Sequence, residues 1–334
     1  MCDMAQRQID VSVIVPVYNV ERHIEKCIRS LFEQTLDSIE YIFVNDCSND
    51  SSMQVLLSVI KDYPDRAKDI QIVELEQNRG VAVARNVGLL HAKGEYVIFC
   101  DSDDWMDNEM LNTMYTVAEK RTADVVMCDF YMVQDTGLIL YRTPKYCMNK
   151  VEFIRQYLRY TWTTIWNLLI RKKLLQDGGL QFPVGYTYCE DFNFAVKVFD
   201  TAKVIVTIDR PFYFYNRLNM NSVMRSSNPR MMHDEIMMYL DVISWFEKRN
   251  TFSLYEKQMS WRILKSKQEW LLTTTTYTRF LALFPNSHCH IWSCPYLNVK
   301  LKVMAWCLTH RLKCISELLL KLRNLKKYSL NWIV

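Results

Sequence analysis

The sequence contains little glycine and no cysteine pattern typical of a disulfide framework or a metal site. Only seven of the 334 residues are glycine, half are hydrophobic, and no repeat or low-complexity segment occurs, which excludes a disordered or fibrous chain. The eleven cysteines include no CxxC pair. We therefore expect reduced, buried thiols in a cytosolic protein, because most of them lie in apolar runs, such as Cys27, Cys100, Cys128 and Cys307.

The chain also lacks a secretory signal at its N-terminus and any long uncharged apolar run, so we expect a cytoplasmic protein that does not cross a membrane. The net charge of +4 is unevenly distributed. Residues 299–334 hold eight Lys or Arg and one acidic residue, a net of +7, which leaves −3 for the rest. This amphipathic segment is suited to an anionic membrane surface, and equally to a helix that covers the rest of the protein. No nucleic-acid recognition motif accompanies the charge.

Strand-like and helix-like segments alternate along the first half of the chain. The short β-rich apolar runs cover residues 11–17, 40–45, 70–75 and 95–100, and stretches with helical spacing lie between them. This alternation predicts an α/β fold with a mostly parallel sheet and helices on both faces. Residues 151–230 indicate a helix, a short strand and loops, and residues 231–334 are largely helical.

Polar residues follow directly after three of these runs, as YN, DCSND and DSDD. Since ligands of such sheets bind beyond the carboxyl ends of the strands, these residues mark a ligand edge. The acids of YVIFCDSDDWMDNEM could cap a helix, but one Asp suffices for that. A calcium loop fails because Met106 and Asn112 stand where Gly and Glu are required. A divalent cation beside a bound phosphate is the remaining explanation.

Two longer blocks are similar to a known family. VSVIVPVYNVERHIEKCIRSLFEQTLDSIEYIFVNDCSND, followed by NRGVAVARNVGLLHAKGEYVIFCDSDD, resembles the family 2 glycosyltransferases with the GT-A fold, over roughly residues 10–225. The resemblance implies a Rossmann-like, mostly parallel sheet flanked by helices, with a helical C-terminal extension. It places a GT-A domain at 1–230, with its nucleotide-sugar half at about 10–130 and its acceptor half at about 131–230, and a helical basic region at 231–334. It also implies a nucleotide-sugar donor and Mn²⁺ or Mg²⁺.

The resemblance assigns the donor site residue by residue. Pro16, Tyr18 and Asn19 would border the nucleotide, and Asp46 would contact the base, although Asn45 replaces the first of two Asp found in many relatives. Within the GxxxARNxG block, Arg85 would lie near the base or diphosphate, or pair with an acid in a helix.

Asp101, Ser102 and Asp103 match the family's DxD motif. In this motif Asp101 would approach the ribose and help to hold the metal, and Asp103 would hold the metal directly. Asp104 would assist as a metal ligand or through a hydrogen bond. Carboxylates about 4 Å apart repel by roughly 1 kcal/mol even in water, so a cation partner suits them.

YCEDFNFAVKV resembles the ED motif of inverting members, with Asp191 as general base and Glu190 at the acceptor; an acidic helix start is the alternative. Trp166 would form an acceptor wall or belong to the core, and Leu168 replaces a Lys common in relatives. The block FYFYNRLNMNSVMR adds three candidates for diphosphate or acceptor binding, Arg217, Ser222 and Arg225.

The combined interpretation is an inverting, metal-dependent hexosyl- or N-acetylhexosaminyltransferase that uses a nucleotide-sugar donor, for which the resemblance implies the UDP form because the family commonly binds uracil. Its acceptor would be a glycan or lipid-linked oligosaccharide in surface polysaccharide synthesis, reached by peripheral contact with the inner face of the plasma membrane. A sugar nucleotidyltransferase needs a Gly-rich loop after its first strand, and VPVYNVERH has no Gly. A catalytically inactive glycan-binding or scaffold protein is the alternative from another class.

Overall fold

The computed structural model of the chain describes residues 8–160, 162–219 and 229–330. The chain divides into two compact units, Met1–Met238 and Tyr239–Val334. The division falls within helix α9 (Pro229–Lys248), whereas the predicted boundary at 230 and 231 lies at the start of that helix. Each unit is described by itself.

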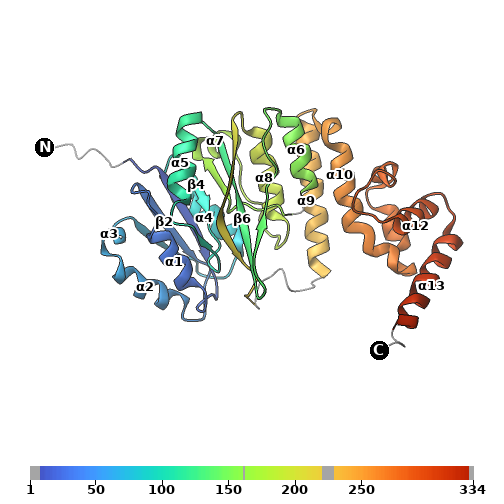
Figure 1. The fold of residues 1–334 in the computed structure, drawn as a ribbon, viewed down its shortest axis with the longest axis horizontal. Helices are drawn as coiled ribbons and strands as arrows, with labels where there is room; N and C mark the ends of the chain where they lie inside the picture. The colour runs from blue at the N-terminus through green and yellow to red at the C-terminus, as the bar shows by residue number, and fades with distance from the viewer. Residues whose placement is uncertain (1–7, 161, 220–228, 331–334) are drawn as a thin grey trace. The chain divides into compact units, whose positions relative to one another are not determined.

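Four parallel strands form the first half of the sheet in the first unit (Figure 1). Their order is β3-β2-β1-β4, and they are β1 (Val11–Val17), β2 (Ile39–Asn45), β3 (Ile70–Glu74) and β4 (Tyr96–Phe99). Every residue of β1, β2 and β4 is buried, as expected for apolar runs covered on both faces. The parallel register brings the carboxyl ends of β1, β2 and β4 to one edge, which is the edge that the polar residues predicted.

The second half of the sheet is mixed. Strand β8 (Leu168–Arg171) is antiparallel to both β4 and β6 (Val125–Gln134), and β9 (Ile205–Asn216) is parallel to β6. The sheet ends in the two-residue strand β5 (Trp105–Met106), antiparallel to β9, while β7 (Gly137–Tyr141) pairs with β6. The strand that follows the DSDD motif therefore pairs with a strand more than a hundred residues later in the sequence.

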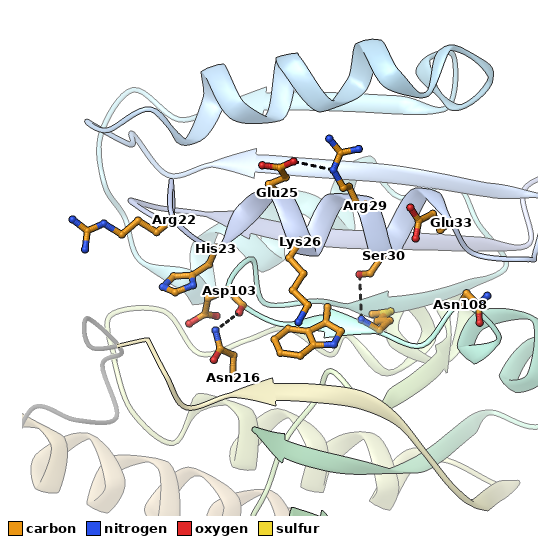
Figure 2. Close-up of a pocket in the computed structure, with 12 residues that line it drawn as sticks. Arg22, His23, Glu25, Lys26, Arg29, Ser30, Glu33, Asp103, Asn108 and Asn216 are labelled. Atoms are coloured by element: carbon orange, nitrogen blue, oxygen red, sulfur yellow. Dashed lines mark hydrogen bonds and ion pairs between the residues drawn. The ribbon is translucent and has the colours of Figure 1, made fainter. Parts of the chain in front are cut away.

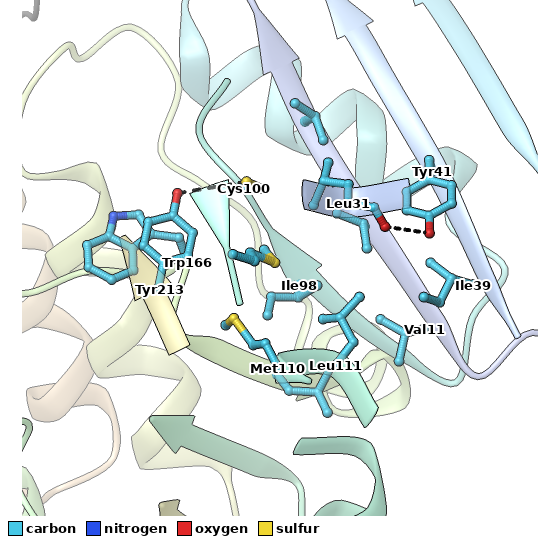
Figure 3. Packing of buried hydrophobic residues seen from close by; sticks show 14 of the residues in the cluster. Val11, Leu31, Ile39, Tyr41, Ile98, Cys100, Met110, Leu111, Trp166 and Tyr213 are labelled. Carbon is cyan, nitrogen blue, oxygen red and sulfur yellow. Dashed lines mark hydrogen bonds between the residues drawn. The ribbon is translucent and has the colours of Figure 1, made fainter. Parts of the chain in front are cut away.

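Helices cover both faces of this sheet. The first face packs α1 (Ile24–Phe32), α2 (Ser52–Asp62) and α5 (Met110–Arg121) into one buried apolar cluster, part of which Figure 3 shows. In this cluster the Tyr41 hydroxyl donates to the Leu31 carbonyl at 2.8 Å. The opposite face carries α4 (Val81–His91) and α8 (Glu190–Thr201), where Phe99 meets the rings of Phe182 and Phe194. The remaining helices of the unit are α3 (Pro64–Ala67), α6 (Lys150–Arg159) and α7 (Lys172–Gly178).

Helix α4 lies unusually close to β1 because of its glycine. A Cβ atom on Gly88 would stand 2.3 Å from Cγ2 of Ile14, so only glycine fits there without a shift. Gly80, which precedes the helix, has φ of +86°, a conformation that other residues rarely adopt. The two glycines of the GxxxARNxG block thus set where α4 begins and how closely it packs against the sheet.

The second unit is helical, as predicted for residues 231–334. It contains the end of α9, then α10 (Phe252–Lys267), α11 (Tyr277–Ala282), α12 (Val299–Thr309) and α13 (Lys313–Leu330), with the 3-10 segments η2 (Gln268–Leu272), η3 (Thr274–Thr276) and η4 (Pro285–His290) between them. None of the helices in the described part of the chain has the length and hydropathy that a membrane crossing requires.

All ten cysteines in the described ranges are free thiols. Cys27, Cys100, Cys128 and Cys307 are buried, as expected from their apolar surroundings in the sequence. The expectation of burial is wrong for three others that lie outside strong apolar runs, since Cys147, Cys289 and Cys314 are exposed.

Candidate active site

The loops after β1 and β2 are joined by hydrogen bonds at the carboxyl edge of the sheet. Asn19, whose φ of 50° is left-handed, accepts at Oδ1 from the Asn49 amide at 2.8 Å, and its own amide donates to Ser48 Oγ at 3.2 Å. Tyr18 is 44% exposed, so its ring is open to a ligand at this edge. Pro16 lies within β1 and is buried.

Asp46 is buried, and both of its carboxylate oxygens accept hydrogen bonds. Its two carboxylate oxygens accept from the amides of Arg79 and Gly80 at 2.7 and 2.8 Å, and the residue is 3% exposed. The carboxylate therefore fixes the turn from which α4 starts. This geometry favours a positioning role for Asp46 over the predicted contact with the base.

Asp104 is likewise held inside the protein. Its Oδ2 accepts from the Tyr213 hydroxyl at 2.8 Å and its Oδ1 accepts from the Asn216 amide at 2.7 Å, at 1% exposure. Burial, with the neighbouring charges of Asp103 and Asp101, raises the pKa of Asp104 well above its ordinary value. These contacts favour the hydrogen-bonding role weighed for Asp104 over the metal-ligand role, because both oxygens already have buried donors.

Asp103 and Asp101 remain partly accessible. Asp103 accepts at Oδ2 from Asn219 Nδ2 at 2.8 Å, and burial followed by the charge of Asp101 raises its pKa. The Asp101 side chain is 27% exposed, and its amide donates to the Tyr213 hydroxyl at 3.1 Å. Ser102, between them, is buried. The DxD segment is thus fixed by partners from β9 and the turn after it.

Arg85 on α4 joins the two acidic motifs. Its Nη2 donates to Asp101 Oδ1 at 2.9 Å, while its Nη1 donates to Asp191 Oδ1 at 2.7 Å and to Glu190 Oε1 at 3.2 Å. The Arg85 side chain is only 3% exposed. Burial opposes the charged guanidinium, but the charges of the three carboxylates outweigh this and raise the pKa of Arg85 above its ordinary value. One cation therefore bridges the end of β4 and the start of α8.

Asp191 has the environment of a group that exchanges protons near neutral pH. Burial raises the pKa of Asp191 to about 8; the positive charge of Arg85 opposes the rise, and Glu190 and Asp101 add to it. Its side chain is 21% exposed, so a ligand can reach it. A general base performs best when its pKa lies near the working pH.

Of the four remaining predicted site residues, the structure describes two, Trp166 and Arg217. Trp166 is 2% exposed and stacks on Tyr213 with ring centroids 4.1 Å apart (Figure 3), which favours the core interpretation over the acceptor-wall interpretation. Arg217 directly follows β9, and its amide donates to the Val133 carbonyl at 3.1 Å. Ser222 and Arg225 lie outside the described residues.

Three residues that sequence reasoning missed hold the DxD segment. The Tyr213 hydroxyl contacts both Asp104 and the Asp101 amide, Asn216 binds Asp104 through its amide and the Asp103 carbonyl through Nδ2, and Asn219 binds the Asp103 carboxylate. All three lie in the FYFYNRLNMN block, so the signal was present. Their hydrogen-bond partners in the DxD segment could not be identified without the fold.

The donor set fits a hard divalent cation that also binds a ligand. In the described part of the chain no group of three or more His, Cys, Asp or Glu could enclose a metal. The two accessible carboxylates of Asp101 and Asp103 are the arrangement used when a Mg²⁺-type ion takes its other ligands from water and a bound phosphate.

Comparison with known proteins identifies one protein family that the chain matches. The profile described as Glycosyl transferase family 2 matches residues 12–181. The uncharacterized glycosyltransferase EpsJ of Bacillus subtilis is 35% identical over 222 residues, which are 64% of this chain and 62% of EpsJ. The poly(ribitol-phosphate) beta-N-acetylglucosaminyltransferase TarS of Staphylococcus aureus is 30% identical over 207 residues, 61% of this chain and 35% of TarS. The chain thus spans less than two thirds of the length of these relatives.

Solved structures have the same fold. The crystal structure of S. aureus TarS 1–349 in complex with UDP-GlcNAc has a TM-score of 0.68 at 19% identity, covering 95% of this chain and 92% of the other. The mannosyltransferase PcManGT of Pyrobaculum calidifontis, in complex with GDP-Man and Mn²⁺, has a TM-score of 0.54 at 16% identity, covering 96% and 88%. The predicted α/β GT-A fold with a helical C-terminal region is confirmed.

Proposed function

The chain belongs to glycosyltransferase family 2, and we propose that it transfers a sugar from a nucleotide-diphosphate donor to a hydroxyl of a surface glycan, with inversion at the anomeric carbon. The observation that carries this proposal is the buried guanidinium of Arg85, which binds Asp101 of the DxD motif and Asp191 of the ED motif at 2.9 and 2.7 Å. A transferase needs its donor-binding carboxylate and its base next to the same reacting carbon.

The donor nucleotide occupies the carboxyl edge of β1, β2 and β4. Tyr18 offers an exposed ring to the base, and the loop joined by Asn19 and Ser48 forms the floor. Asp101 accepts from the ribose, Arg217 lies beside the diphosphate, and Asp46 acts indirectly by fixing the turn before α4. The TarS complex with UDP-GlcNAc supports UDP as carrier and a hexose or N-acetylhexosamine as the sugar. Because PcManGT binds GDP-Man, GDP sugars are the second class of donor to be tested.

Asp103 and Asp101 would hold a divalent cation, Mn²⁺ or Mg²⁺. Their mutual repulsion, which adds to the raised pKa of Asp103, is relieved when a cation binds between them. When bound, such an ion neutralises the diphosphate and stabilises it as a leaving group. The Mn²⁺ in the PcManGT complex supports this assignment.

Asp191 removes the proton of the acceptor hydroxyl. As the acceptor oxygen forms its bond to the anomeric carbon, the bond from that carbon to the nucleotide diphosphate breaks, and the proton passes to the Asp191 carboxylate. Arg85 holds this carboxylate in place, and Glu190, which shares the guanidinium, borders the acceptor. A positioned base of this kind contributes about 10²–10⁴-fold to the rate.

The acceptor is a cell-surface glycan or its lipid-linked precursor, in line with the surface polymer named for TarS. The second unit supports peripheral contact with an anionic membrane surface, since Trp292 and Val299 are 53% and 73% exposed and Lys300, which follows Val299, is exposed as well. Co-sedimentation with phosphatidylglycerol vesicles tests this contact, with phosphatidylcholine vesicles as the neutral control.

Release of UDP or GDP from a panel of nucleotide sugars, with Mn²⁺ and candidate glycans, tests the central proposal. We expect Asp191→Asn to lower transfer by about 10²–10⁴-fold while UDP with Mn²⁺ still stabilises the variant against heat. Asp103→Asn should lose the stabilisation that depends on Mn²⁺. Asp177→Asn, which changes an exposed acid on α7 that pairs with Lys173, is the matched control. Full transfer by Asp191→Asn would remove Asp191 from the role of base.

A further inference from the structure

A groove of about 680 Å³ runs along α1 on the first face of the sheet, and no predicted site residue except Asp103 lines it (Figure 2). We call it the α1 groove. One wall consists of α1 and the turn before it, and the other of β5 and the residues next to it. Asp103 and Asn216 stand at one end, where His23 lies beside Asp103 in Figure 2. The lining residues on the α1 side include Arg22, Lys26, Arg29 and Glu33, whose spacing of three or four places them on one helix face.

The lining of the α1 groove holds three cations, Arg22, Lys26 and Arg29, and three carboxylates, Glu25, Glu33 and Asp103. Glu25 binds Arg29 at 2.9 Å and Glu33 accepts from the Tyr63 hydroxyl at 2.7 Å, so both carboxylates have partners. Arg22 and Lys26, by contrast, form no ion pair with a carboxylate in the ranges that the structure describes. The α1 wall of the groove therefore presents two cations without an ion-pair partner, near the end where Asp103 of the DxD segment stands.

Lys26 is exposed, and its ammonium group lies over an aromatic ring. Its Nζ lies 3.1 Å from the ring centroid of Trp105, and the same ring stacks on Phe214 with the ring centroids 5.5 Å apart. Burial lowers the pKa of Lys26 somewhat, which fits an ammonium placed over an aromatic face. A pre-positioned cation costs less side-chain entropy when it binds an anion.

We propose that the α1 groove binds the anionic groups, phosphate or carboxylate, carried by an acceptor glycan, through Arg22 and Lys26. This rests on the proposed function, because the groove leads to Asp103, which shares the DxD segment with Asp101. The ring of Trp105 is already used by Lys26 and Phe214, so the groove recognises charge rather than the flat face of a neutral sugar. The nucleotide edge, with Tyr18 and Asn19, is separate from it.

Isothermal titration of the full chain with short inorganic polyphosphate, an oligogalacturonate and a neutral malto-oligosaccharide tests the proposal. We expect both anionic probes, or polyphosphate alone if phosphate geometry matters, to bind with an affinity that falls as salt rises. Lys26→Glu combined with Arg22→Glu should weaken this binding by at least about tenfold. Lys120→Glu, which reverses an exposed charge on α5 outside the groove, should leave it unchanged.

Thermal stabilisation by UDP with Mn²⁺, measured on the same proteins, separates the groove from the donor site, and the groove variants should respond like the wild type. Equal losses in Lys120→Glu, equal binding of the neutral sugar, no binding of either anion, or loss of the UDP effect in the groove variants would each overturn the proposal. If UDP stabilises no protein, including the wild type, but anion binding depends on Lys26, the anion site stands and the proposed transferase function fails.

Discussion

Replacing Arg85 by methionine removes the one cation that three carboxylates share. The three donated bonds of Arg85 measure 2.7–3.2 Å, and the side chain is 3% exposed. Removing one partner of a buried ion pair typically costs about 3–5 kcal/mol. Since 1 kcal/mol shifts Tm by about 2–4 °C in a unit of this size, we expect Arg85→Met to lower Tm by about 6–20 °C. Calorimetry of the full chain measures this.

The pH dependence of the Tm loss in Arg85→Met distinguishes lost charge from lost packing as the cause of the destabilisation. With Arg85 present, burial raises the pKa of Asp191 to about 8, above its ordinary 3.8, so its carboxyl favours the fold fully below pH 3.8 and loses that contribution as pH rises through 8. Without the guanidinium the pKa of Asp191 rises further, because the charge of Arg85 lowers it. The loss in Tm should therefore be larger at pH 8 than at pH 5.

Two variants complete this experiment. Arg29→Met is the matched control, because Arg29 also makes ion pairs of 2.9 Å with two carboxylates, Glu25 and Asp62, but is 38% exposed, and it should change Tm little. Arg85→Lys keeps the charge without the planar fork and should fall between the wild type and Arg85→Met. An equal Tm loss for Arg85→Met at pH 5 and pH 8 would mean that lost packing, not charge, explains the destabilisation, and our reasoning would be refuted.

Three further predictions concern stability. Tyr213→Phe should cost about 1–3 kcal/mol in urea unfolding, because Asp104 loses a buried donor; an unchanged midpoint would contradict this. Gly88→Ala should cost about 1–3 kcal/mol, because its Cβ would stand 2.3 Å from Ile14, and wild-type stability would show that α4 shifts freely. Burial lowers the pKa of Lys267 from 10.5 to about 7, so its contribution is full above pH 10.5 and lost as pH falls through 7. Wild-type Tm, compared with Lys267→Met, should thus rise from pH 7 to 9, and parallel curves would refute this.

The sequence was sufficient for the parallel part of the sheet and its ligand edge because both depend on local patterns. Continuous apolar runs marked β1, β2 and β4, and the polar residues after them marked the edge, since parallel strands end on the same side. The mixed second half was beyond such reasoning. Strand β8 is antiparallel to both of its neighbours, and nothing in the four residues Leu168–Arg171 specifies which strands they join.

Individual site residues were harder to assign because their roles depend on distant partners. The Asp46 carboxylate binds backbone amides 33 and 34 residues away, and such partners leave no trace in side-chain identity. Trp166 was compatible with core or acceptor wall until Tyr213, from another strand, was found stacked on it. Asp104 looks like a third metal ligand in the sequence, and only the position of β9 shows where its oxygens point.

The shared guanidinium also limits what single substitutions in the site can prove. Asp101, Glu190 and Asp191 all bind Arg85, so removing one carboxylate changes the charge balance felt by the other two. Residues in one ion-pair network are coupled by about 0.5–3 kcal/mol. A loss of activity in Asp101→Asn therefore combines weaker donor binding with an altered base. Comparison of Asp101→Asn, Asp191→Asn and the double variant separates them, because only the coupled part departs from additivity.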